Sequence, residues 1–505
     1  MSVFVAWKDR PVSVQHISPR AIPLEDLETL EWLQYRTLRK TPGMFKSDFW
    51  DTLLLQASTT EPAIMHGVLA LSSVHRCGVT LEIKSLLSQG NAGRLWTAGL
   101  QHYVEAINQL RRRVLPVGAQ DRMTLRVVII ACLVFVCVEL LRGQIGSAQA
   151  HLRSGMSLLR EAGLLSQYDL PTAKALKSPG AVDRWIVEVF CRIHLHDTNF
   201  NLLFFNLPTS NHGPTTGHVH YDKAVLPPRF TYMEEAWASV DRLLLAAVRL
   251  TQDCKTVLAA GKYPRVDISL RKRREQLRTD LAQWSNAFHK SSAAPFKIPR
   301  GVHDQSPALI QISLDMATIL IETSLDVSNE MIYDNHNETF LRLLDSTTGM
   351  LRIHREQSEK KTGTPSLHMS FTIFDICTLP VLYFTATRCR VPGTRLRALA
   401  GLSRLRHRER HWDGWLTYAV AKKIVELEEQ GACGVSSLNV AAGATVPASS
   451  RLWQHRIVTV GDPFSALSVE FERQDINGDP SAHKVDLDIR SGVWSDEVHG
   501  VRTLI

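Results

Sequence analysis

The sequence has few cysteines, and none of them belongs to a closely spaced pair. The chain of 505 residues contains eight cysteines and no C-x-x-C, and the nearest two, Cys132 and Cys137, stand five positions apart. Zinc fingers, zinc knuckles and thioredoxin-type redox motifs need such pairs, so the sequence excludes all three as local motifs. Several cysteines lie within apolar runs, which predicts buried free thiols and favours a reducing compartment.

The signatures of common enzymes are missing as well. The sequence has no G-x-S-x-G nucleophile elbow, no phosphate-binding P-loop, no Rossmann glycine fingerprint and no H-E-x-x-H zinc-protease motif. These absences argue against a familiar hydrolase, ATPase or dehydrogenase. They leave an unfamiliar enzyme open, although we predict that the protein is not an enzyme and assign no catalytic, cofactor-binding or metal-binding residues and no cofactor.

Long apolar runs and a strong excess of one charge are also absent. The longest apolar run, Val127–Val138, is shorter than the roughly 20 residues that cross a bilayer, so we predict a buried core helix and no membrane partner. No charged segment precedes the short apolar stretch at the start, so we expect no secretory signal. The 58 Lys and Arg residues against 50 Asp and Glu give a net charge of only +8, which does not by itself establish a nucleic-acid partner.

Helical periodicity dominates the sequence up to about residue 430. Apolar residues share one helix face between Leu100 and Leu110 and again between Trp412 and Leu427. Residues 309–325 and 371–388 are apolar on most sides, so we expect both segments deep in a helical core.

The pattern changes after residue 450. Residues 456–460, 466–472 and 484–490 alternate between polar and apolar, which predicts strands. Asn477-Gly478 lies between the last two and predicts a hairpin turn, because both residues tolerate positive φ. We therefore predict an all-α protein, a large multi-helix domain with a small C-terminal β hairpin or sheet.

Composition suggests where the parts of the chain begin and end. Residues 431–450 are small, polar and low in charge, which is typical of a linker. We predict an N-terminal extension over 1–40, the helical domain over 41–430, this linker, and a small β-rich appendage over 451–505.

Two short motifs resemble metal sites but have the wrong spacing. His407 and His411 stand four positions apart, but Glu does not directly follow the first histidine and the arginines around them would repel a cation. We interpret this motif as a solvated helix face or loop. The run Asp475–Asp479 resembles a calcium loop, but its glycine comes too early, so we expect a turn.

A third motif, formed by His194, His196 and Asp197, faintly resembles the metallohydrolase pattern H-x-H-x-D-H. Its aspartate comes one residue early and the final histidine is missing. Because an apolar helical segment surrounds the motif, we interpret these residues as hydrogen-bonded polar groups of the core. They are also the first candidate site residues of an alternative function, a helical metabolite-binding protein or enzyme.

Two basic clusters remain. Arg271, Lys272, Arg273 and Arg274 follow one another and form a candidate nuclear import signal. The second cluster has eight arginines between residues 388 and 410. Either cluster could contact phosphates or an acidic partner, but a solvated helix face is the more common origin of such a run, and we favour it for both.

Three segments resemble one family, the fungal-specific transcription factor domain, which is the regulatory region of fungal binuclear zinc-cluster transcription factors. Residues 45–75 are similar at Phe49, Trp50, Glu61, Pro62, His66, Ala70, Leu71 and His75. Residues 102–159 are similar at Tyr103, Ala106, Ile107, Leu110, Phe135, Glu139, Gly143, Ala148, His151, Gly155 and Leu159. Residues 379–429 are similar at Pro380, Leu382, Tyr383, Ala386, Cys389, Arg390, Trp412, Glu428 and Glu429.

The resemblance implies a fungal transcriptional regulator, with secondary-metabolite pathways among the expected targets and the nucleus as the main compartment, the cytoplasm being a second. It implies an all-helical scaffold that contacts protein partners or a small-molecule effector. Family members usually carry a six-cysteine zinc cluster before this domain, but residues 1–40 contain no cysteine. We therefore expect regulation without a zinc-cluster DNA reader of its own. Direct DNA binding, the oligomeric state, and a gene model that omits an N-terminal cluster stay open.

Overall fold

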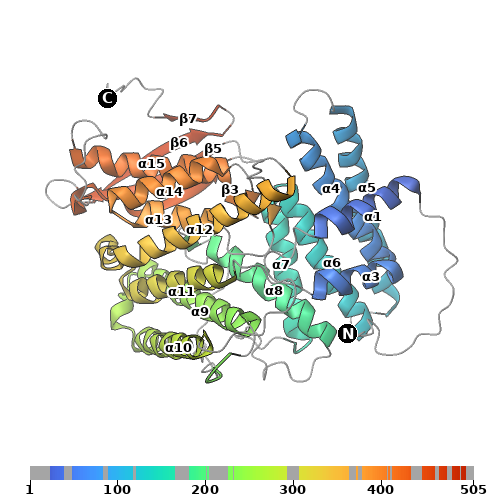
Figure 1. Ribbon diagram of the computed structural model, residues 1–505, viewed down its shortest axis with the longest axis horizontal. Helices are drawn as coiled ribbons and strands as arrows, with labels where there is room; N and C mark the ends of the chain where they lie inside the picture. Colours follow the sequence, from blue (N-terminus) through green and yellow to red (C-terminus); the bar gives the residue numbers. More distant parts are fainter. Residues whose placement is uncertain are drawn as a thin grey trace. The chain divides into compact units, whose positions relative to one another are not determined.

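The computed structural model describes most of the chain. The described residues are 23–38, 48–83, 89–117, 121–164, 181–200, 202–203, 226–230, 233–292, 306–362, 371–372, 378–405, 408–409, 412–433, 446–460, 466–474, 480–489 and 491–495. The chain divides into two compact units, the first made of residues 1–197 and 370–375 and the second of residues 198–369 and 376–505 (Figure 1). We describe each unit by itself.

The first unit consists almost entirely of helices. They are α1 (Leu24–Trp32) and its π-helical continuation η1 (Leu33–Thr37), η2 (Phe49–Leu53), α3 (Leu54–Thr60), α4 (Pro62–Ile83), α5 (Gln89–Val117), α6 (Arg122–Leu141), α7 (Ile145–Glu161) and most of α8 (Ala181–Phe200), with the short strand β1 (Phe371–Thr372).

Helix α6 is the core of the first unit because its sequence is apolar on every side. Every side chain from Ile129 to Leu140 is buried, and α4, α5 and α7 pack against the helix. Asp121 begins the helix by accepting a hydrogen bond from the backbone N–H of Thr124 at 2.9 Å. The predicted core helix is therefore confirmed.

The second unit combines helices with a sheet. Its helices are α9 (Met233–Ala259), η4 (Pro264–Val266), α10 (Ile268–Ser292), α11 (Ser306–Thr323), η5 (Ser324–Asp326), η6 (Glu330–His336), α12 (Asn337–Thr362), α13 (Thr378–Arg388), α14 (Pro392–Arg404), α15 (Gly414–Cys433) and η7 (Ala448–Ser450). Its strands are β2 (Arg408–Glu409), β3 (Trp412–Asp413), β4 (Trp453–Val460), β5 (Ala466–Gln474), β6 (Pro480–Asp488) and β7 (Val493–Trp494).

Helices α9, α10 and α11 pack side by side in the second unit. The indole of Trp284 on α10 is fully buried and donates to the Ser239 hydroxyl on α9 at 2.7 Å. A buried indole N–H needs such a partner, so this bond fixes how α10 lies on α9.

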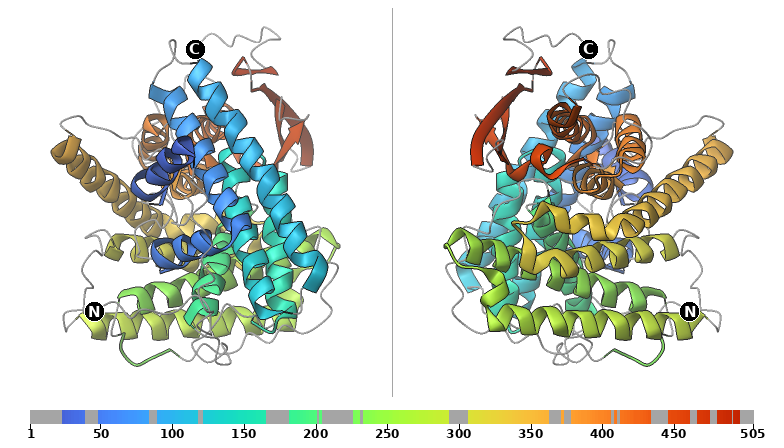
Figure 2. Two further views of the ribbon diagram at one scale, coloured as in Figure 1. Left: turned by 90° about the vertical axis from the view of Figure 1, so that its right-hand side faces the viewer. Right: turned by 90° about the vertical axis from the view of Figure 1, so that its left-hand side faces the viewer.

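The C-terminal sheet has the strand order β4-β5-β6-β7, and all neighbours are antiparallel. Gln474 of β5 pairs with Pro480 of β6, so the two strands form a hairpin around residues 475–479, which lie outside the described residues. The sheet lies next to α15, where the ammonium group of Lys423 is 5.6 Å from the ring centroid of Trp494 (Figure 2). The predicted all-α class with a small C-terminal sheet is confirmed.

The structure corrects part of one predicted helix. Residues 371–388 do not form one helix: 371–372 are in strand β1, and helix α13 begins only at Thr378. Pro380 stands in the first turn of α13, where proline's missing N–H has no intrahelical partner to lose. Hydrophobic periodicity predicts the buried helix but not where it begins.

Two segments, Arg122–Leu141 and Pro307–Asp326, are long and apolar enough to cross a membrane by length and composition alone. Most of each is buried inside the protein, which is typical of the core helices of a folded domain. Six cysteines are buried free thiols, as predicted: Cys77, Cys132, Cys137, Cys191, Cys254 and Cys389.

Candidate functional site

A polar cluster on three helices is the candidate site of the first unit. It contains Tyr103 of α5, Glu139 and Arg142 at the end of α6, and His151 of α7, and we call it the α5–α7 cluster. The Tyr103 hydroxyl lies 3.0 Å from Nε2 of His151. Arg142 donates to both carboxylate oxygens of Glu139 at 2.9 and 3.1 Å. The four side chains therefore form one connected set.

The α5–α7 cluster presents an aromatic and a cationic group near its outer edge. The guanidinium carbon of Arg142 lies 5.7 Å from the Tyr103 ring centroid and 6.0 Å from that of Trp96. Tyr103 is nearly buried, whereas the Trp96 side chain is 37% exposed. A partly exposed indole beside a guanidinium group can stack on a planar ligand and hydrogen-bond to its oxygens.

Burial keeps the Tyr103–His151 pair neutral. Burial and the hydrogen bond with Glu139 raise the pKa of Tyr103 above its ordinary value. Burial also lowers the pKa of His151, although the Glu139 carboxylate opposes this effect. At neutral pH the pair is a phenol beside an uncharged imidazole, so it can donate and accept hydrogen bonds.

A second histidine pair joins α4 to α5. Nδ1 of His66 lies 3.1 Å from Nδ1 of His102, and Asp26 of α1 lies 3.2 Å from Nε2 of His102. Burial and the neighbouring His102 lower the pKa of His66, while Glu105 and Asp26 oppose the shift. The folded chain therefore favours a neutral His66 ring.

These shifts predict that stability falls on mild acidification. The lowered pKa values of His66, His151 and His336 mean that the unfolded chain, whose histidines titrate near pH 6.5, binds these protons more tightly. The stabilisation is complete above about pH 6.5 and is lost as the pH falls below it. Urea unfolding at pH 7.5 and 5.5 should give a lower midpoint at pH 5.5. His66→Gln should reduce the difference, whereas the exposed control His289→Gln should retain it; equal differences in wild type and His66→Gln would contradict the prediction.

The metallohydrolase-like motif does not form a site among the described side chains. Leu195 is buried, His194 is half-buried, and Asp197 accepts a hydrogen bond from Gln149 at 2.9 Å. The side chain of His196 lies outside the described residues. Across the described part of the chain, no group of three or more His, Cys, Asp or Glu side chains is placed to hold a metal ion.

His407, His411 and the run Asp475–Asp479 lie outside the described residues. Glu409, between the two histidines, is buried and accepts hydrogen bonds from the Thr378 hydroxyl at 2.7 Å and the Leu379 N–H at 2.8 Å. Its carboxylate therefore caps the start of α13.

The prediction that the arginines of residues 388–410 lie on a solvated helix face is wrong for the first three of them. Arg388, Arg390 and Arg395 are buried and bind carboxylates of Glu330 and Glu428. Arg390 donates to Glu428 at 2.8 Å and to Glu330 at 3.2 Å, and Arg395 donates to Glu428 at 2.6 Å. Among the described arginines of this segment, only the later Arg397 and Arg404 are exposed.

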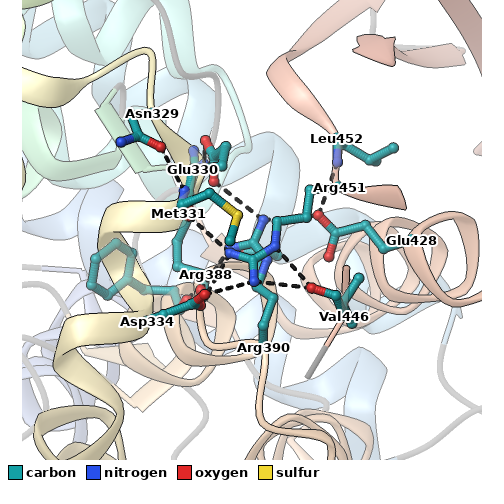
Figure 3. Close-up of polar contacts among 12 residues, drawn as sticks. Asn329, Glu330, Met331, Asp334, Arg388, Arg390, Glu428, Val446, Arg451 and Leu452 are labelled. Carbon is teal, nitrogen blue, oxygen red and sulfur yellow. Dashed lines mark hydrogen bonds and ion pairs between the residues drawn. The ribbon is translucent and has the colours of Figure 1, made fainter. Parts of the chain in front are cut away.

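The ion pairs extend to the segment that leads into the sheet (Figure 3). Arg451 donates to Asp334 of η6 at 2.7 and 3.0 Å and to the Val446 carbonyl at 2.9 and 3.0 Å. Glu428 of α15 also accepts from the Leu452 N–H at 3.0 Å. We call this set of Glu330, Asp334, Arg388, Arg390, Arg395, Glu428 and Arg451 the arginine cluster.

Opposite charges keep the carboxylates of the arginine cluster ionised. Burial raises the pKa of Glu330 and Glu428, but the guanidinium groups facing them more than offset this and hold both below the ordinary value. The charged form of nearby Lys255 on α9 is disfavoured instead, because burial and the positive Arg388 lower its pKa to about 7. The cluster is a closed structural network rather than a surface for phosphates.

Sequence reasoning missed the acidic half of the arginine cluster. Glu330 lies in η6, 58 and 60 positions before Arg388 and Arg390. Asp334 of the same helix lies 117 positions before its partner Arg451, which is the first residue of the segment predicted to be a β-rich appendage. No local spacing marks them, so only the fold brings them together.

The candidate import signal lies on α10. Arg271 and Lys272 are exposed, whereas Arg273 and Arg274 are half-buried. Arg273 donates to Asp253 of α9 at 2.6 Å. Two of the four basic side chains are therefore presented outward, and one holds α10 on α9.

Comparison with known families bears on the first unit. Residues 39–196 match the model of the fungal specific transcription factor domain. This range contains the whole α5–α7 cluster, and this part of the chain is similar to that domain family, as the resemblance predicted.

A relative extends the comparison beyond this domain. The aspercryptin biosynthesis cluster-specific transcription regulator atnN of Emericella nidulans is 23% identical over 467 residues, which cover 79% of this chain and 73% of the relative. No solved structure gives a significant match.

Proposed function

We propose that this chain, a fungal transcriptional regulator, controls a biosynthetic pathway by binding a small effector at the α5–α7 cluster. The domain in residues 39–196 and the relative named as a cluster-specific transcription regulator support the class and the kind of pathway. The observation that carries the effector site is the neutral Tyr103–His151 pair, 3.0 Å apart, beside the half-exposed Trp96. Such a site suits a planar molecule with hydrogen-bonding oxygens.

We also propose that these 505 residues do not read DNA through a zinc cluster and have no enzymatic activity. The eight cysteines are scattered, and the six described ones are buried as free thiols. A binuclear cluster needs six thiolates gathered around two metal ions, which these positions do not offer. A gel-shift assay at physiological salt, with the salt stated, tests the point, because specific duplex binding by this chain would refute it.

The nucleus is the compartment we propose for the protein, with protein partners in addition to the effector. The exposed Arg271 and Lys272 then contribute an import signal together with Arg273 and Arg274. The position of a fluorescent fusion carrying Arg271→Gln and Lys272→Gln tests this: loss of nuclear accumulation supports the signal, and unchanged accumulation refutes it.

Tyr103→Phe tests the effector site in the native host. The substitution removes the hydroxyl that faces His151 but keeps the ring packed on Phe135, at a centroid distance of 5.0 Å. Loss of one hydrogen bond to a bound effector should lower pathway transcripts about fivefold to tenfold, measured by quantitative PCR.

The control is Arg153→Gln, an exposed position on α7, which should leave transcripts unchanged. Wild-type transcript levels from a folded Tyr103→Phe protein would refute the proposed site. Thermal unfolding of both variants separates loss of an effector contact from loss of the fold.

A further inference from the structure

Three large apolar side chains are exposed close together where α9 passes into α10. Tyr263 is 74% exposed, Val266 73% and Ile268 61%. They fall within six consecutive positions around the short helix η4. Scattered single apolar residues on a surface need no explanation, but three within six positions at one turn make that turn a candidate interaction site.

The turn that carries these side chains is held in place. Pro264 is buried, and the N–H groups of Val266 and Asp267 bond to the carbonyls of Tyr263 and Pro264 at 3.0 and 3.1 Å. Asp267 caps α10 by accepting from the N–H groups of Ser269 and Leu270 at 2.8 and 3.1 Å. The apolar side chains are therefore presented by a fixed backbone, which reduces the entropy cost of binding.

Positive charge surrounds the apolar group. Lys262, Arg265, Arg271 and Lys272 are all exposed. The carboxylate of Asp267 is occupied as a helix cap, and Arg265 also forms an ion pair with Asp326. From residue 262 to 272 the sequence has these four cationic side chains and one acidic side chain, so this surface keeps a net positive charge even when Asp326 is counted with it.

We propose that this surface, which we call the α9–α10 docking surface, binds an acidic segment of a partner protein that carries aromatic or aliphatic side chains. The inference goes beyond the effector site, because it lies in the second unit and concerns a macromolecule. The cationic rim fits acidic residues, and the central Tyr263, Val266 and Ile268 supply apolar contacts. A phosphate backbone would use the rim alone and leave these three side chains unused, so the apolar centre favours protein over DNA.

The test measures binding of a fluorescein-labelled peptide that repeats Asp-Phe-Glu-Leu to the full chain by fluorescence anisotropy. Two double variants remove the two parts of the surface separately: Val266→Ser with Ile268→Ser, and Arg271→Glu with Lys272→Glu. Each should weaken binding about tenfold or more, and the charge-reversed variant should also flatten the dependence on salt. The matched control Leu396→Ser removes another exposed apolar side chain of the same unit and should bind like wild type.

Three results would overturn the proposal. The first is equal binding of the peptide by wild type and both double variants. The second is equal binding by wild type of a peptide in which serine replaces Phe and Leu. The third is complete displacement of the peptide by duplex DNA, to the same extent from wild type and from the Val266→Ser, Ile268→Ser variant. The last result would identify a phosphate-binding surface instead. Unchanged thermal unfolding of the variants shows that they are folded.

Discussion

Replacing Glu428 by glutamine should destabilise the second unit by about 3–5 kcal/mol. Its carboxylate is fully buried and binds Arg390 and Arg395, and it also accepts from the Leu452 N–H at 3.0 Å. Glutamine keeps the shape but leaves two buried guanidinium groups short of negative charge. No other described acceptor replaces the lost carboxylate, since Arg390 Nε and Arg395 Nη1 already lack a hydrogen-bond partner among the described residues.

Urea unfolding, followed by tryptophan fluorescence, measures this effect. The control is Arg397→Gln, which breaks an ion pair with Asp345 whose side chains are 51% and 57% exposed. That change should cost less than about 1 kcal/mol, because water screens exposed pairs. If Glu428→Gln changed stability no more than Arg397→Gln, the arginine cluster would not hold the fold of this unit.

Gly155→Ala should destabilise the first unit by about 1–3 kcal/mol through overpacking. Gly155 is buried on α7, and a Cβ atom at this position would overlap the ring of Phe190 on α8. The ring is completely buried, so it cannot move aside without disturbing its neighbours. The glycine leaves room for the Phe190 ring against α7.

Gly146→Ala on the same helix is the matched control. An added Cβ there meets no atom within 4 Å, so alanine should be neutral or stabilise by up to about 1 kcal/mol through its better helix propensity. Thermal unfolding of the two variants compares them directly. A Gly155→Ala protein as stable as Gly146→Ala would show that the Phe190 ring does not pack against Gly155.

Features set by local pattern could be predicted from the sequence. The apolar run in α6 predicts a core helix because it is apolar on every side, and β4, β5 and β6 show the period-2 alternation of strands because burial acts on every second residue. The predicted apolar helix face between Leu100 and Leu110 is less regular, because Val104 within it is 55% exposed.

Features set by distant partners could not be predicted. The local sequence of Arg388, Arg390 and Arg395 shows only positive charge, and it is the same whether solvent or buried carboxylates surround them. Glu330 lies 58 and 60 positions from Arg388 and Arg390 in the sequence. For the same reason the sequence did not predict the α5–α7 cluster. Tyr103 and His151 are 48 residues apart, and in the sequence they stood out only as separate positions that resemble the family.

The bond from the Leu452 N–H to Glu428 has a consequence for the order in which the chain folds during synthesis. The arginine cluster also takes Arg451, which bonds to the Glu330 carbonyl across 121 positions. A nascent chain that ends before residue 451 therefore lacks the ion-pair partner of Asp334 and one hydrogen bond to Glu428. The hydrogen-bonded network of the second unit is complete only after residue 452 has left the exit tunnel, so its last contacts form late in synthesis.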